Sequence, residues 1–437
     1  MVDTIVRLQG PRYIYNAKSY ENACAGLALF FEDSIACTFT MLRISLILVL
    51  HVALASVVDS SALPYSKPYH HLLDKRQSTN DTSLQIDLGY EIYKGVSNET
   101  TGLNTWKGLV CPHHRDVRSL LIVHRIRFAA APLGSLRWQA PQAPELNRSQ
   151  VFQASSFASQ CPQSSDSMDG PTTGVPASED CLFLNVYAPQ NATNLPVLVW
   201  IHGGGYGLGN GQQDMSAIIN ANNQSFIGVA IQYRLGAFGF LSSDEVFRNG
   251  VANAGILDQT FALQWVQSYI GQFGGNASSV TVSGESAGGG SVMLQAMAFG
   301  GTIGEELFTN AIAASPFLPM QYGYKDWVPS QAYYAFASAA GCLQTTAYGS
   351  TPNTIFECLI AQDTAVLQNA SFNVSASGVY GTWGFLPVTD GVFIQDVPSH
   401  QLLQKRLNGK NLLVGVSSST TPRDCEISSL YLLCLTY

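Results

Sequence analysis

The chain has 437 residues, enough for roughly two or three average domains or for one large α/β enzyme. Charged residues make up 12% of the chain, against about 25% in a typical soluble domain. The formal net charge of −8 gives no support for nucleic-acid binding, and we expect neither a nucleic-acid partner nor a stable membrane partner.

In chain order, the first predicted element is a secretory signal peptide at residues 41–58. It has a basic start at Arg43, an apolar run over residues 44–55 and small residues at Ala53 and Ala55 that suit cleavage. The sequence therefore predicts a secreted protein. A signal anchor is the alternative if translation starts at Met1, although the apolar run is short for a helix that spans a membrane.

Two segments flank this signal. We interpret residues 1–40 as a spurious N-terminal extension and residues 59–76 as a possible propeptide, because the latter ends at the dibasic pair Lys75-Arg76. Secretion would also explain the low charge through N-linked sugars, whose candidate acceptors are Asn80, Asn98, Asn147, Asn191, Asn223, Asn276, Asn369 and Asn373.

The first motif with chemical content follows a predicted strand at residues 195–201. This run is apolar throughout, as in strands that are covered on both faces, and it leads directly into His202-Gly203-Gly204-Gly205-Tyr206-Gly207. Glycines allow the backbone to approach a substrate, and backbone N–H groups are the usual donors for the oxyanion of an acyl transfer. A flexible surface turn is the other interpretation of this segment.

The second motif is G-x-S-x-G at residues 284–288, centred on Ser286. The β-branched run Val280–Val282 precedes it and predicts a buried strand, while residues 287–297 are small, apolar and compatible with a helix. So tight a turn forces Ser286 into a strained conformation at a helix N-terminus, and the flanking positions must be glycine because a Cβ would collide with neighbouring strands. The pattern predicts a nucleophile elbow and ester hydrolysis.

With both motifs in place, the chain resembles the type-B carboxylesterase and lipase family, which includes the cholinesterases, and within it a secreted member of the fungal type. The resemblance covers roughly residues 80–416, and four segments carry it: residues 178–187, 232–241, 253–266 and 273–288. It implies an α/β-hydrolase fold, in which helices flank a central, mostly parallel sheet. It also implies that Ser286 is the nucleophile and that the N–H groups of Gly204, Gly205 and Ala287 form the oxyanion hole, with no metal or cofactor.

The family completes its catalytic triad with a Glu and then a His, and here the sequence departs from the pattern. Residues 411–416 resemble the strand before the acid, but the segment that follows does not resemble the acidic loop. Asp424 and Glu426 are better explained as solvated tail residues, and His400 precedes that strand, so we treat it as structural. The triad acid and His are therefore not identifiable, and the chain resembles a C-terminally truncated family member with an unrelated tail at 417–437.

A second departure lies within the hydrolase domain, which we assign to residues 77–416. Residues 105–108 should continue directly into residue 126, and we interpret the intervening 109–125 as an insert, such as a retained intron read in frame. A zinc site is conceivable there, yet the spacing lacks the paired ligands of known structural sites, the candidates being Cys111, His113, His114 and His124.

Cysteine usage agrees with secretion. Outside the suspect segments, four cysteines form two pairs, Cys161–Cys181 and Cys342–Cys358, and the first pair resembles the family's bridge. The loop that the first pair closes shows no apolar stripe of a lid helix, which favours an esterase for small soluble esters. We therefore expect a secreted serine carboxylesterase. The alternatives are a non-catalytic or impaired carboxylesterase-like binding protein and a truncated product that lacks the triad acid and His.

Overall fold

The computed structural model describes residues 84–99, 119–164, 177–343, 354–378, 383–417 and 430–436. The predicted N-terminal extension, signal peptide and propeptide lie outside the described residues, and so do residues 109–118 of the predicted insert.

The strands are β1 (Gln85–Asp87), β2 (Ile92–Lys94), β3 (Val96–Glu99), β4 (Ser119–Arg127), β5 (Val151–Gln153), β6 (Phe183–Pro189), β7 (Leu195–Ile201), β8 (Ile227–Ile231), β9 (Gly275–Glu285), β10 (Asn310–Ala314), β11 (Asn411–Ser417) and β12 (Leu430–Thr436). The α-helices are α2 (Ser216–Ala221), α3 (Gly236–Phe240), α4 (Asp244–Asn249), α5 (Ala254–Tyr269), α6 (Ala287–Met297), α7 (Trp327–Ala339), α8 (Ile355–Ala361), α9 (Thr364–Ala376) and α10 (Pro398–Leu403). Short 3-10 helices are η3 (Gly134–Leu136), η4 (Ile270–Phe273) and η5 (Ala298–Gly301).

Among the described strands, nine form one sheet in the order β12-β11-β10-β9-β7-β8-β6-β4-β3, and β1, β2 and β5 form a separate small sheet. The central run from β11 to β8 is parallel throughout, and antiparallel strands extend it at both edges. This architecture confirms the predicted α/β class with a mostly parallel centre.

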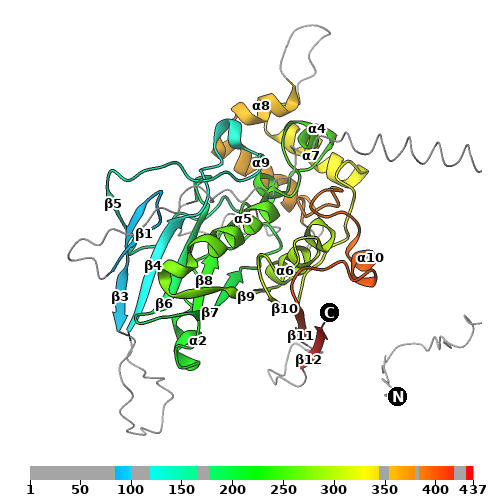
Figure 1. Ribbon diagram of the computed structural model, residues 1–437. Coiled ribbons are helices and arrows are strands. Elements are labelled where there is room, and N and C mark those ends of the chain that lie inside the picture. Colours follow the sequence, from blue (N-terminus) through cyan, green and yellow to red (C-terminus); the bar gives the residue numbers. More distant parts are fainter. Residues whose placement is uncertain are drawn as a thin grey trace, which may run out of the picture. The chain divides into compact units, whose positions relative to one another are not determined.

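The order of the parallel strands decides which face each helix covers. The chain moves from β7 to β8 in one direction along the sheet and then reverses to reach β9, β10 and β11. Because parallel crossovers are right-handed, α2 must cover one face, while α5 and α6 cover the other. The contacts agree with this arrangement, since α2 packs on β8 and α6 packs on β9 and β10 beside α5 (Figure 1).

The strand that leads into the glycine motif has the predicted bounds, residues 195–201, but its two faces differ. Val197, Val199 and Ile201 are buried beneath the α5–α6 layer, whereas Leu198 and Trp200 on the α2 face are only partly buried. The prediction of full cover on both faces is therefore met on one face only. The physical reason is that α2 is a helix of six residues and shields less of the sheet than α5 and α6 do.

Residues 119–125, which the sequence analysis assigned to an insert, belong to β4. This strand pairs with β3 on one side and with β6 on the other, and its register shifts between Val123 and Ile126. Leu120 and Val123 are fully buried, so the apolar part of the segment contributes to the core of the sheet. The last seven residues of the predicted insert are thus part of the sheet, and the assignment of 109–125 as an insert in the family pattern stays a prediction.

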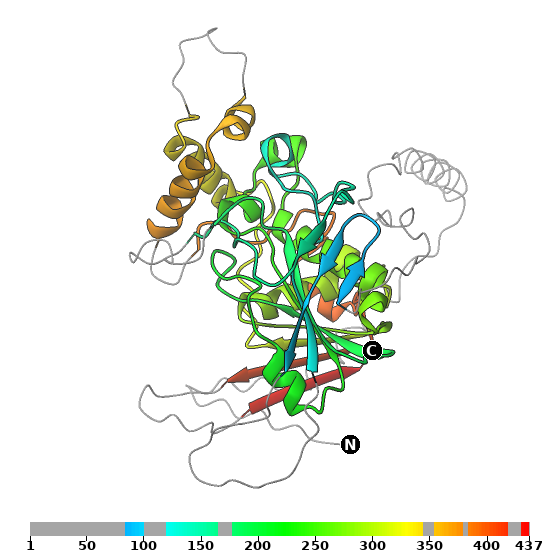
Figure 2. The ribbon, with the colours of Figure 1, turned by 90° about the vertical axis from the view of Figure 1, so that its left-hand side faces the viewer.

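The predicted unrelated tail also contributes to the sheet. Residues 430–436 form β12, which pairs antiparallel with β11 over its whole length. Figure 2 shows these two red strands side by side at the edge of the sheet. Asp424 and Glu426 lie outside the described residues.

Helices α4, α7, α8 and α9 gather away from the sheet, at the top of Figure 1. A buried ion pair connects them to the sheet: Arg137 Nη2 lies 2.7 Å from Glu179 Oε1. Arg137 Nη1 also donates to the carbonyl oxygen of Ile360 in α8, and Thr364 Oγ1 in α9 donates to Glu179. Both charges are thereby paired and hydrogen-bonded, as burial of charge requires.

Candidate active site

Ser286 lies between the end of β9 and the start of α6 and has φ 56° and ψ −121°. This is a strained conformation for a residue with a side chain. Backbone hydrogen bonds hold it from both sides: Ser286 N–H donates to the carbonyl oxygen of Ala314 at 3.0 Å, and Phe317 N–H donates to that of Ser286 at 2.8 Å. The turn therefore has the geometry of the predicted elbow.

The glycines on either side of the serine are sterically required. A Cβ on Gly284 would lie 2.5 Å from the carbonyl oxygen of Gly288 and 2.8 Å from that of Ile201. A Cβ on Gly288 would overlap the carbonyl oxygen of Ile201 at the end of β7. The predicted reason for glycine at these two positions is confirmed.

The glycine loop after β7 lies directly against this elbow. A Cβ on Gly203 would lie 3.1 Å from Ser286 Cβ, so the two segments are in contact. The loop turns sharply through positive φ values at Gly204, Gly205 and Tyr206, and Leu208 N–H closes the turn on the carbonyl oxygen of Gly204 at 2.8 Å. It is thus an ordered turn and not a flexible surface loop.

The three backbone donors of the predicted oxyanion hole are the N–H groups of Gly204 and Gly205 in the loop and of Ala287 after the elbow. In the part of the chain that the structure describes, none of these N–H groups donates a hydrogen bond to the protein. Ala287 begins α6, where the aligned peptide dipoles favour negative charge. Donors of this kind stabilise a carbonyl oxygen that becomes negatively charged.

Two partly exposed aromatic side chains, Trp383 and Phe317, border the loop. A Cβ on Gly205 would overlap the indole of Trp383, and one on Gly207 would lie 2.6 Å from that ring. Tyr206 and Phe385 are buried in the core and cannot contact a substrate from there.

His202 opens the glycine loop and is fully enclosed. Its Nδ1 lies 2.9 Å from the carbonyl oxygen of Gly203, and its ring stacks on Tyr233 with centroids 4.3 Å apart. Burial lowers the pKa of His202 to about 4, so the imidazole is neutral at pH 7. Its role here is to hold the start of the loop, and the sequence analysis assigned it none.

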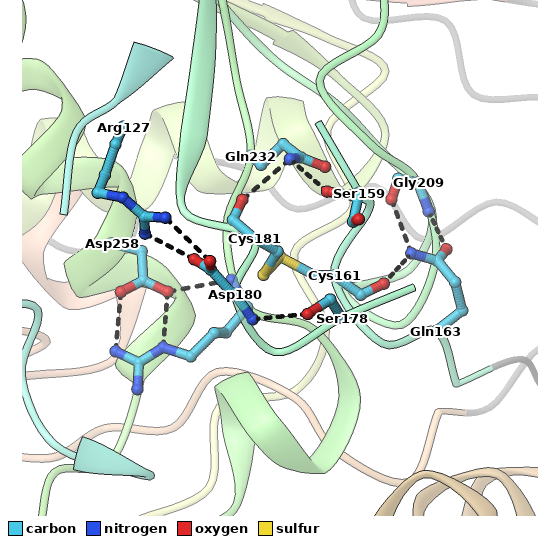
Figure 3. The surroundings of a disulfide bond; sticks show 11 residues. Arg127, Ser159, Cys161, Gln163, Ser178, Asp180, Cys181, Gly209, Gln232 and Asp258 are labelled. Atoms are coloured by element: carbon cyan, nitrogen blue, oxygen red, sulfur yellow. Dashed lines mark hydrogen bonds and ion pairs between the residues drawn. A yellow bond between two sulfur atoms is a disulfide. The ribbon is translucent and has the colours of Figure 1, made fainter. Parts of the chain in front are cut away.

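The first disulfide supports the other end of the loop. Cys161 and Cys181 are bonded, as predicted, and Gln232 bridges the carbonyl oxygens of Cys181 and Ser159 beside them (Figure 3). Two residues after Cys161, Gln163 exchanges a pair of hydrogen bonds with Gly209: its Nε2 donates to the glycine oxygen at 2.9 Å, and its Oε1 accepts from the glycine N–H at 2.7 Å.

The neighbouring residue adds a third bond, because Ser164 N–H donates to the carbonyl oxygen of Gly207 at 2.7 Å. The disulfide segment thereby fixes the outer end of the glycine loop. Gln163 is 4% exposed, and only its sequence position next to a bridged cysteine could have pointed to it. Residues 165–176 of the loop closed by this disulfide lie outside the described residues.

The second predicted disulfide, Cys342–Cys358, is also present and joins the end of α7 to α8. This disulfide lies in the helical group formed by α4, α7, α8 and α9 and not beside Ser286.

None of the three histidines in the described ranges is hydrogen-bonded to Ser286. His124 contacts Asn185, His202 contacts Gly203, and His400 contacts Asp396 at 3.3 Å. His400 is an exposed residue of the surface helix α10, as predicted.

The described ranges contain no cluster of three or more His, Cys, Asp or Glu side chains placed to bind a metal ion. Of the zinc candidates, Cys111, His113 and His114 lie outside these ranges. No helix within the same ranges is both long and apolar enough to cross a membrane.

Comparison with known proteins extends these observations. A sequence profile of the carboxylesterase family matches residues 113–424. Mouse carboxylesterase 1E is 34% identical over 311 residues, which cover 67% of this chain and 53% of the relative. Carboxylesterase patB of Aspergillus clavatus is 30% identical over 373 residues, which cover 74% of this chain and 62% of the relative.

Solved structures agree with the sequence relatives. The crystal structure of Aspergillus niger EstA matches with a TM-score of 0.62 and 34% identity, over 76% of this chain and 59% of that chain. A thermophilic pNB esterase matches with a TM-score of 0.62 and 28% identity, over 78% of this chain and 66% of that chain. The chain spans about half the length of the mouse relative. Because the family profile matches more than half of its residues, the chain belongs to the carboxylesterase family.

Proposed function

We propose that this protein is a serine carboxylic ester hydrolase in which Ser286 is the nucleophile. The observation that carries the proposal is the contact between the strained turn at Ser286 and a glycine loop in which the N–H groups of Gly204 and Gly205 donate no hydrogen bond within the described residues. A strained serine at a helix N-terminus beside unpaired backbone donors suits acyl transfer better than it suits packing.

In the proposed reaction, Ser286 Oγ attacks the ester carbonyl carbon as its proton leaves to a base. The N–H groups of Gly204, Gly205 and Ala287 stabilise the resulting oxyanion, each contributing roughly 3 kcal/mol to the transition state. The tetrahedral intermediate expels the alcohol and leaves an acyl-enzyme, and water then releases the acid. This chemistry uses a hydroxyl and backbone amides and requires no metal or cofactor.

The proposed substrates are small carboxylic esters. Trp383 and Phe317 give the site apolar walls next to the loop, which favours an apolar acyl or alcohol group. The names of the relatives, carboxylesterase and para-nitrobenzyl esterase, fit this class of substrate. We propose neither a nucleic-acid partner nor a stable membrane partner.

We also propose that the protein is secreted. Two disulfides suit an oxidising compartment, and residues 41–58 have the pattern of a signal peptide. N-linked sugars at some of the eight sequons belong to the same proposal.

Labelling with a fluorophosphonate tests the nucleophile. This reagent reacts with a serine that is activated and not with an ordinary hydroxyl. We expect the full chain to be labelled at Ser286, as peptide mass spectrometry will show, and Ser286→Ala to abolish both labelling and hydrolysis of p-nitrophenyl butyrate. A folded chain that is not labelled would contradict the proposal.

One observation favours a second candidate, a carboxylesterase-like protein that binds its ligand without efficient turnover. Ser286 has no histidine partner within the described residues, and a serine without a positioned base is a weak nucleophile. For this candidate, ester binding would survive Ser286→Ala while labelling of the parent chain would be absent.

A further inference from the structure

Tyr206 lies in the middle of the glycine loop, yet its side chain is turned into the core. Its φ of 64° is unusual for a residue with a side chain, and its ring is fully buried. The ring packs edge-on against Phe240 with centroids 5.2 Å apart. Gly236 N–H donates to the Tyr206 carbonyl oxygen at 2.8 Å and fixes the backbone there. Strained backbone positions persist where the surrounding structure fixes them, and such positions cluster at functional sites.

The phenol of Tyr206 connects the loop to the elbow. Its hydroxyl donates to the carbonyl oxygen of Phe317 at 3.2 Å, and the N–H of the same Phe317 donates to the carbonyl oxygen of Ser286 at 2.8 Å. Phe317 thus accepts a hydrogen bond from the loop through its carbonyl oxygen and donates one through its N–H to the backbone of Ser286.

A second polar side chain lies near the phenol. Ser291 in α6 offsets part of the rise in the pKa of Tyr206 that burial causes, and Gln259 Nε2 in α5 donates to Ser291 Oγ at 2.9 Å. The hydrogen-bonded series itself runs from Tyr206 through Phe317 to Ser286. Linked hydrogen bonds in a buried site polarise and strengthen one another.

Gly290 leaves the space that this series needs. A Cβ there would overlap the carbonyl oxygen of Phe317 and lie 2.5 Å from Tyr206 Oη. Gly290 lies within α6, where a glycine costs roughly 1 kcal/mol relative to alanine. The close approach of Tyr206 to Phe317 explains that glycine.

From this geometry we propose that Tyr206 is a positioning residue, whose phenol fixes the glycine loop relative to Ser286 through the backbone of Phe317. The inference rests on the proposed function for its catalytic consequence, but not for its structural one. If the hydroxyl is lost, the loop keeps its fold and its packing, while its N–H groups sample positions away from the oxyanion.

The structural consequence is tested by amide hydrogen exchange on the full chain without substrate. Tyr206→Phe keeps the buried ring and removes only the hydroxyl. We expect exchange in residues 203–209 and 316–318 to accelerate roughly fivefold, as the loss of one hydrogen bond allows. Tyr333→Phe is the matched control, because Tyr333 is also fully buried and donates to Glu245 at 2.7 Å in the helical group.

The control should leave exchange in the loop unchanged. Equal exchange in the loop for Tyr206→Phe and the parent chain would overturn the inference, and so would equal acceleration in both variants. This readout does not depend on activity, so it decides the role of Tyr206 even if fluorophosphonate labelling of the parent chain fails.

Where the parent chain is labelled, kinetics test the catalytic consequence. We expect Tyr206→Phe to lower kcat for p-nitrophenyl butyrate roughly tenfold with little change in KM, since a misplaced oxyanion donor acts in the transition state. Ser291→Ala should give a smaller fall in the same direction. A change in KM alone would show that Tyr206 acts on substrate binding and would contradict the proposed role.

Discussion

The regions around Ser286 and His400 differ in how many contacts hold the side chain in place. Around Ser286, strand ends, tight turns and backbone hydrogen bonds hold a strained serine and a glycine loop in contact. Around His400, which is the only histidine after Ser286 in the sequence, a short surface helix carries an exposed imidazole beside Asp396. Several contacts therefore hold Ser286 in place, whereas the side-chain contact of His400 within the described residues is a single long one to Asp396.

The difference shows which parts of a serine hydrolase site are local properties of the chain. The proposed nucleophile and the proposed oxyanion donors come from the ends of the neighbouring strands β7 and β9 and depend on the sheet for their positions. A general base must reach the serine from elsewhere in the fold, so its position depends on side chains that are distant in sequence. The predictions below test how independent the two regions are.

The largest effect is expected where β7 and the elbow touch. In Gly288→Ala the new Cβ overlaps the carbonyl oxygen of Ile201, so β7 and the elbow must separate. Because the oxyanion donors then lose their alignment with Ser286, we expect fluorophosphonate labelling to slow by roughly a hundredfold or more. Overpacking should also destabilise the fold by about 1–3 kcal/mol, measured by urea unfolding.

Gly271→Ala is the matched control. No heavy atom lies within 4 Å of a Cβ at this position, and its φ is not positive. Labelling and stability should both stay near those of the parent chain. If Gly288→Ala is labelled as fast as Gly271→Ala, the steric account of the elbow is wrong.

The same contrast explains which features of the structure can be predicted from the sequence. The strand at 195–201, the helix at 287–297, the flanking glycines and both disulfides are confirmed, because each depends on a contiguous pattern or on a count of cysteines.

The residues that hold the glycine loop in place are not predicted from the sequence. Gln163 and Tyr206 act through partners that are distant in sequence, and His202 gains its neutral state from burial. Residues 119–125 were excluded on the continuity of a family pattern, although their apolar run fits a strand. These features depend on tertiary contacts that no local pattern specifies.

An intermediate effect is expected from pH, through His202. Its pKa is about 4 when folded and about 6.5 when unfolded, so between these values the unfolded chain binds a proton that the folded chain does not. The free energy of unfolding should therefore fall as the pH drops from about 6.5 to about 4, by at most about 1.4 kcal/mol per pH unit from this group. Above about pH 6.5 the contribution is fully present.

Urea unfolding of the parent chain and of His202→Gln at several pH values measures this slope. The variant will be less stable because it loses the stacking on Tyr233, but its unfolding free energy should depend less on pH between 4 and 6.5. Parallel curves for the two proteins would mean that His202 is not the group that is kept neutral by burial.

The smallest effect is expected at His400, and it is the strongest test of the contrast between the two regions. The His400 side chain is 61% exposed and its contact with Asp396 lies within one short helix, so His400→Gln should change the free energy of unfolding by less than about 0.5 kcal/mol. Labelling of Ser286 should stay within about twofold of the parent rate, since a residue that does not touch the serine has no transition-state role to lose. If His400 were the general base, the variant would lose roughly 10⁴-fold or more. Such a loss would mean that α10 reaches Ser286 during the reaction, and the two regions would then have to be treated as one site.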